Sequence, residues 1–228
     1  MSNRPEEDYD PRTILGCLGK AGIADALLGA GSMFAGEAPP EYVIIVGVDS
    51  FLDAASIEHF LAQERIRCSI NPDGFIPGEA AAAIALTPRQ SSGHALWIEG
   101  VGTAHEPASP FDEATSLRAM GLTKALRNAL QSANWSADDL LFHASAIGGE
   151  QWYFKEAALA MDRVMTRKVA YFPHRVAAQS VGEIGAAFGP LILSWIGAEM
   201  APDDLGTRGL LHLGNENGQR AALAIHHR

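Results

Sequence analysis

The segment that most constrains the fold is a nearly continuous run of β-branched and apolar residues, YVIIVGV, at positions 42–48. A strand with one solvated face alternates apolar and polar residues, whereas a continuous apolar run is typical of a strand buried on both faces. We therefore expect residues 42–48 to form a strand that helices cover on both sides. A parallel or mixed sheet in a layered fold provides such cover.

Helical and strand patterns alternate along the rest of the chain. Apolar residues at helical spacing predict helices over residues 22–34, 53–63, 122–133, 154–167 and 180–200, the last one long and mostly apolar. Short apolar or β-branched runs predict strands over residues 79–86, 95–101, 140–146, 169–172, 209–214 and 220–226. Asn217-Gly218, between the last two strands, is typical of a hairpin turn. These elements predict an α/β fold with mixed sheets.

The length and the distribution of apolar residues bear on domain organisation. The chain has 228 residues, of which 47% are hydrophobic, so it can bury the core of one large domain. Residues 1–12 include four acidic side chains and almost nothing apolar. We therefore expect a flexible acidic leader over residues 1–12 and a single domain over residues 13–228.

Charge and residue content exclude several classes of function. The net charge is −10 and no basic run interrupts it, so we expect neither nucleic-acid nor membrane binding. No export signal is visible, and Cys17 and Cys68 are expected to be free thiols in the cytoplasm. His226 and His227 are expected at a frayed terminus. Because no His/Cys/Asp/Glu group has ligand spacing, we expect no metal and no other cofactor.

Three stretches, in this order, resemble the β-ketoacyl synthases of the thiolase-like superfamily. The first is VIIVGVDS followed by NPDGFIPGEAAAAIAL, at residues 43–50 and 71–86. The second, DLLFHASAIGGEQWYFKEAALAM at residues 139–161, is similar to the strand, loop and helix that carry the family's first catalytic histidine. The third, SVGEIGAAFGPLILSWI at residues 180–196, is similar to the helix start that carries the second. The resemblance implies an incomplete thiolase-like fold, because almost all of the family's first half is absent.

The resemblance also implies that the catalytic positions have changed. It places Ser145 at the family's first histidine and His143 at the asparagine before it. It places Gly182 at the second histidine and Ala177 at the family's lysine. Condensation needs donors aimed at developing charge, yet glycine donates nothing and serine takes up no proton near neutral pH.

Cys17 is the candidate nucleophile, because it precedes a helix whose dipole would favour a thiolate. An ungapped count instead puts the family's cysteine near residues 19–22. The other candidates also have structural interpretations: a buried thiol for Cys17 and Cys68, and a hydrogen-bonded core histidine for His143. A solvated loop histidine is the corresponding expectation for His174.

Two further positions complete the list of candidates. Glu183 lies beside the lost second histidine, where a helix N-terminus stabilises an acid without any catalytic role. Residues 13–16 are expected to form the strand that, in the family, pairs with its mate across a two-fold axis.

The leading interpretation is a catalytically inactive ketosynthase-like protein that binds another protein, as a non-catalytic subunit or an adaptor. The absent half would leave apolar faces uncovered, and such faces mark interfaces. The VGVDS and DGFIPGE pattern also resembles ketosynthase-like proteins of bacterial type VI secretion clusters, which implies an adaptor there. The expected partner is a protein or a second copy of this chain.

Two alternatives stay open. One is an acyltransferase or acyl-thioester hydrolase that uses Cys17 with His143 and takes an acyl carrier protein or acyl-CoA as its partner. The other is a complementing half, for which a separate chain supplies the half that carries the nucleophile.

Overall fold

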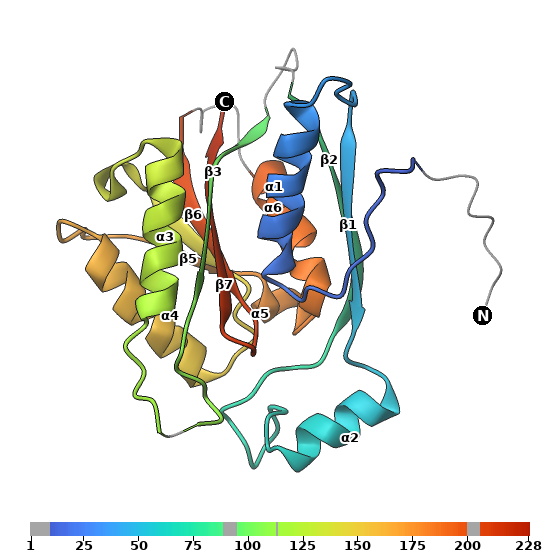
Figure 1. Ribbon diagram of the computed structural model, residues 1–228. Helices are drawn as coiled ribbons and strands as arrows, with labels where there is room; N and C mark the ends of the chain where they lie inside the picture. Colours follow the sequence, from blue (N-terminus) through green and yellow to red (C-terminus); the bar gives the residue numbers. More distant parts are fainter. Residues whose placement is uncertain (1–9, 89–94, 113, 200–205) are drawn as a thin grey trace.

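The molecule is built of stacked layers of sheets and helices (Figure 1). The computed structural model describes residues 10–88, 95–112, 114–199 and 206–228. These residues form four layers. In order through the molecule, the layers are a two-stranded sheet, a pair of helices, a five-stranded sheet and an outer pair of helices. The predicted α/β fold with mixed sheets is confirmed. No helix among these residues is both long and apolar enough to cross a membrane.

Two helices form the layer between the sheets. α1 (Gly22–Phe34) and α6 (Phe188–Glu199) contact strands of both sheets, and their apolar side chains fill the main core. The outer helices α3 (Met120–Ala133) and α4 (Gln151–Val164) enclose a second core on the other face of the larger sheet. Each outer helix begins slightly earlier than its apolar pattern predicts.

The larger sheet has the strand order β3-β7-β6-β4-β5. β4 pairs in parallel with both β5 and β6, and the remaining neighbours are antiparallel. The strands span Leu96–His105 (β3), Phe142–Ser145 (β4), His174–Val176 (β5), Arg208–Gly214 (β6) and Gln219–His227 (β7). The hairpin predicted at Asn217-Gly218 joins β6 to β7, and Gly218 has the positive φ of 88° that such turns need. His226 and His227 belong to β7, so the prediction of a frayed terminus is wrong.

The smaller sheet corrects the expectation of a strand buried on both faces. β1 (Val43–Ser50) and β2 (Glu79–Leu86) pair in antiparallel, and only one face of this sheet contacts the inner helices. On the other face Ile44, Val46 and Val48 are 66%, 61% and 66% exposed. The described residues provide helices for one side of this sheet only, so the continuous apolar run does not correspond to burial on both sides.

The predicted helix over residues 180–200 is interrupted. The segment begins with α5 (Ala178–Val181), turns at Gly182, passes through the 3-10 turn Gly185–Ala187 and continues as α6. Gly182 has a φ of 71°, a left-handed conformation that ends a helix. Residue 200 lies outside the described residues.

Two predicted strands also differ from the structure. Residues 169–172 form no strand; β5 begins instead at His174, after the Pro173 carbonyl accepts a hydrogen bond from the His143 backbone at 3.0 Å. Proline has no N–H to donate, which suits the edge of a sheet. Residues 13–16 are extended, but they pair with no strand of the described chain. The shorter elements are α2 (Ala54–Ala62), capped by Asp53, and the 3-10 turn Ala137–Asp139.

The contact between α3 and β3 yields a stability prediction. A Cβ at Gly102 would clash with the backbone carbonyl of Ala125 in α3, whereas a Cβ at Gly29 in α1 would meet nothing within 4 Å. We expect Gly102→Ala to lower the free energy of unfolding by about 1–3 kcal/mol. Gly29→Ala should raise it by about 0.5–1 kcal/mol, because alanine loses less backbone entropy in a helix. Urea denaturation measures both changes, and equal stabilities would contradict this account of the packing.

Candidate functional site

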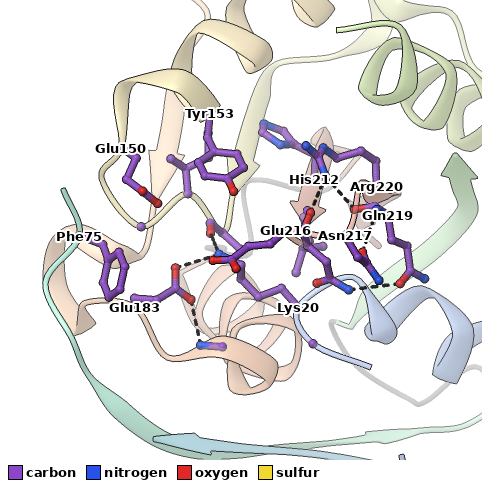
Figure 2. Close-up of a pocket in the computed structure, with 18 of the residues that line it drawn as sticks. Lys20, Phe75, Glu150, Tyr153, Glu183, His212, Glu216, Asn217, Gln219 and Arg220 are labelled. Atoms are coloured by element: carbon purple, nitrogen blue, oxygen red, sulfur yellow. Dashed lines mark hydrogen bonds and ion pairs between the residues drawn. The ribbon is translucent and has the colours of Figure 1, made fainter. Parts of the chain in front are cut away.

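A pocket of about 380 Å³ opens where the N-terminus of α1 meets the segments that follow β4 and β6 (Figure 2). Residues on both sides of the β6–β7 hairpin form one wall, and the segment around Phe75 forms the opposite wall. Each of the three stretches that carry the resemblance described above contributes to the lining: Phe75 from the first, Glu150 from the second and Glu183 from the third. The pocket is therefore the candidate functional site of the described chain.

Each basic side chain in the pocket wall is paired with an acid. Lys20 Nζ lies 2.8 Å from Glu183 Oε2, and Arg220 Nε lies 2.8 Å from Glu156 Oε1. A third pair, Arg65 Nε with Glu150 Oε1 at 2.8 Å, closes the opposite side, and Glu216 also contacts this arginine. The basic groups of the described pocket wall are thus all engaged in ion pairs, unlike the donors of a condensing site, which stay free for a developing charge.

Glu183 lines the pocket, next in sequence to the Gly182 that the resemblance places at the family's second histidine. Its Oε2 accepts from Lys20, its Oε1 accepts from the Gly185 backbone N–H at 3.0 Å, and its side chain is 7% exposed. Figure 2 shows its carboxylate directed toward Lys20. An ionised carboxylate only accepts hydrogen bonds, so it cannot stabilise an oxyanion. The interpretation of Glu183 as a helix-end acid missed this ion pair, because Lys20 is 163 residues away in the sequence.

The Arg220–Glu156 pair is the most deeply buried of the three. Both side chains are about 2–3% exposed, and Arg220 also donates to the backbone carbonyl of Asn215 at 2.7 Å. Burial raises the pKa of Glu156, and the charge of Arg220 opposes that shift. The pair links β7 to α4 and holds the hairpin that forms the pocket wall.

Cys17 and His143 do not share a site. Cys17 lines the pocket and is exposed, while the described ring contacts of His143 are with Phe172, His174 and His212. Cys68 is exposed as well, so the interpretation of both cysteines as buried thiols is wrong. No described contact therefore joins the Cys17 thiol to the His143 imidazole.

Three histidines instead gather on the larger sheet, which we call the histidine cluster: His143, His174 and His212. The ring centroids of His143 and His174 are 3.9 Å apart, and His212 lies 5.9 Å and 6.0 Å from them. Ser145 is fully buried, and its Oγ lies 2.7 Å from Nε2 of His174. His174 is thus half-buried in β5 and not the solvated loop residue that the sequence suggested.

Burial keeps the histidine cluster uncharged near neutral pH. It lowers the pKa of His143 to about 3, with a smaller contribution from His174, and lowers the pKa of His174 to about 4. It also lowers the pKa of His212 well below its usual range. Sequence reasoning missed the cluster because its members are tens of residues apart. His143 and His212 lie in predicted strands. A single sequence, however, does not reveal the strand register that brings their side chains together.

No protein-family model matches the chain, and no curated protein matches it. Among solved structures, the chain is similar to a chain of the AntDE:AntF complex, a type II PKS acyl-carrier protein with its ketosynthase. The sequence identity is 14%, the TM-score is 0.76, and the match covers 92% of this chain and 61% of that one.

Two further ketosynthase structures give the same result. One is the ketosynthase ApeO with its chain length factor ApeC from Xenorhabdus doucetiae, with 14% identity and a TM-score of 0.73 over 91% of this chain and 58% of that chain. The other is a β-ketoacyl synthase from Burkholderia phymatum STM815, with 15% identity and a TM-score of 0.68 over 91% and 60%. The predicted resemblance is confirmed at the level of the fold: this chain has a ketosynthase-like fold and spans about 60% of the length of these chains.

Proposed function

We propose that the chain is a catalytically inactive ketosynthase-like protein that works by binding another protein, as a non-catalytic subunit or an adaptor. The observation that carries this proposal is the uncovered outer face of the β1–β2 sheet. Cross-strand partners on that face are Ile44 with Ala85, Val46 with Ala83 and Val48 with Ala81. All six side chains are exposed, so they form a continuous apolar surface. Apolar surfaces of this kind mark protein interfaces.

The adjoining N-terminal segment supports the same proposal. Ile14 and Leu15 are 77% and 94% exposed in an extended stretch that pairs with no strand of the described chain. An extended segment with free backbone groups is a template for pairing with another chain. Its apolar side chains would be buried by that pairing.

The comparisons suggest the class of partner. One similar structure is a ketosynthase in complex with its chain length factor, and another is a ketosynthase in complex with an acyl-carrier protein. A ketosynthase-type subunit, or a second copy of this chain, presents matching sheet and helix layers. An adaptor role beside type VI secretion genes is the variant that the resemblance of the VGVDS and DGFIPGE segments implies, and the neighbouring genes distinguish the two roles.

The pocket supports the inactive part of the proposal. Condensation requires a thiolate together with free donors that hold the thioester oxygen. Here Lys20 is engaged by Glu183, and of the three clustered histidines only His212 lines the pocket, so a pair of imidazoles is not available there. The exposed thiol of Cys17 at the pocket keeps acyl transfer as a second candidate function.

The first test is catalytic. The purified protein, incubated with acyl- and malonyl-thioesters, should form no condensed product, because loss of a single oxyanion donor already costs about 100- to 1000-fold in rate. Product chromatography and intact-protein mass follow both possible reactions. Cys68→Ala is the matched control for Cys17→Ala, since both thiols are exposed.

The outcomes separate the candidates. Condensation that disappears in Cys17→Ala contradicts the proposal outright. Single acylation that depends on Cys17 and not on Cys68 supports the acyltransferase alternative. Equal labelling of both thiols, without product, is ordinary thiol chemistry and agrees with an inactive protein.

The second test concerns the β1–β2 face. Val46→Asp places a charge in the middle of the exposed apolar surface and should weaken self-association, or binding to a ketosynthase-type partner, by at least tenfold, an energy of about 1.4 kcal/mol. Tyr171→Asp is the control, because Tyr171 is 80% exposed in the segment before β5, on the other sheet. Sedimentation equilibrium at micromolar concentration measures the effect. A wild-type protein that stays monomeric and binds no ketosynthase-type chain would refute the proposal.

A further inference from the structure

The histidine cluster is assembled by the register of three adjacent parallel strands. β4 lies between β5 and β6, and His143 is directly opposite His174. His212 is opposite Ser145, two residues beyond His143. Because side chains two apart on a strand share one face, all three imidazoles stand on the same side of the sheet. This placement does not depend on flexible loops.

The imidazole nitrogens of the cluster lie close together, and two of them have no hydrogen-bond partner among the described residues. One nitrogen from each ring can be chosen such that all three lie within 4.8 Å of one another. His143 Nδ1 and His212 Nε2 are buried without a hydrogen-bond partner, and these two residues are only 8% and 3% exposed. Buried polar atoms are almost always satisfied, so two orphaned nitrogens in one cluster need an explanation.

The surroundings of the cluster restrict what could satisfy these atoms. The ring of Phe172 stacks on His143 at 5.4 Å, and Phe154 meets His174 edge-on at 5.9 Å. Ser145 Oγ holds His174 Nε2 at 2.7 Å and so orients that ring. Hydrogen-bond partners commonly orient metal-bound histidines in this way. No carboxylate takes part in the described cluster, which disfavours Ca²⁺ and Mg²⁺, since both prefer oxygen ligands.

We propose that His143, His174 and His212 bind one zinc ion, or another late first-row divalent ion, in a site with three imidazole ligands. Imidazole suits such ions, and burial favours the neutral ring that can ligate. Zinc takes nitrogen ligands at about 2.0–2.1 Å, which places tetrahedral ligand atoms roughly 3.4 Å apart. Binding therefore needs small rotations of the rings, which draw the nitrogens together.

The proposed metal site adjoins the pocket, but the proposed protein-binding function does not require the ion. His212 belongs to the histidine cluster and also lines the pocket. Three protein ligands leave a fourth position for water or for a ligand group. The proposed metal site does not depend on protein binding at the β1–β2 face, because the two features lie on different sheets. Failure of one proposal would therefore leave the other untouched.

The test uses the full chain with Cys17→Ser and Cys68→Ser, since exposed thiols bind zinc on their own. After treatment with a chelator, calorimetric titration with Zn²⁺ should show one high-affinity ion per chain. Titration with Co²⁺ should give the strong visible absorption of a tetrahedral nitrogen site. In this background Zn²⁺ should also raise Tm, because an ion that binds only the folded state stabilises it.

Variants locate the site. His174→Ala, at the most accessible member of the cluster, should weaken Zn²⁺ binding at least 100-fold and abolish the rise in Tm. His59→Ala, at an exposed histidine of α2, is the control and should change neither quantity. Ser145→Ala should keep one ion per chain but weaken its binding about 10- to 100-fold, the usual effect of removing a group that orients a ligand.

Either of two results overturns the proposal: absence of Zn²⁺ binding in the starting protein, or binding that is equal in His174→Ala and His59→Ala. If His174→Ala does not fold in the absence of metal, Ser145→Ala decides, because it removes only a hydroxyl. Unchanged affinity in that variant then counts against the site.

Discussion

The rest of the structure depends on the close contact between the inner helix layer and the two sheets. A Cβ at Gly47 of β1 would clash with the backbone carbonyl of Ala186, and a Cβ at Gly189 of α6 would lie 2.6 Å from Cβ of Ile23 in α1. Glycine at these positions allows α1 and α6 to fit between the sheets. The same fit brings Lys20, just before α1, against Glu183, just before α6. Within the part of the chain that the structure describes, no helix covers the outer face of β1 and β2, where Ile44, Val46 and Val48 are exposed.

Electrostatics gives the pocket its character. A site for condensation is dry, and its donors are free to meet a developing charge. In this chain the basic groups of the pocket already have carboxylate partners, of which Glu156 is almost completely buried. Removing one partner of a buried ion pair strongly lowers the stability of the fold, because it leaves the other charge buried and unpaired. These ion pairs therefore hold the walls of the pocket together.

The parallel part of the larger sheet has a different chemical character. There β4, β5 and β6 present neutral imidazoles to one another, with aromatic rings around them and a buried serine that holds one of them. Polar atoms that are left unsatisfied in such surroundings are uncommon in folded proteins. The pocket and the histidine cluster meet at His212, and the uncovered sheet face lies on the other side of the inner helices. A single chain thus has two separable candidate functions.

The sequence by itself determined the order of most elements, the α/β class and the ketosynthase-like fold, because apolar periodicity and short motifs are local properties of the chain. It could not show that one face of Val43–Ser50 is exposed, since burial depends on which layers exist to cover a strand. It also could not bring His143, His174 and His212 together, or pair Lys20 with Glu183. Those contacts follow from strand register and helix packing, which join residues far apart in the sequence and which only the tertiary structure decides.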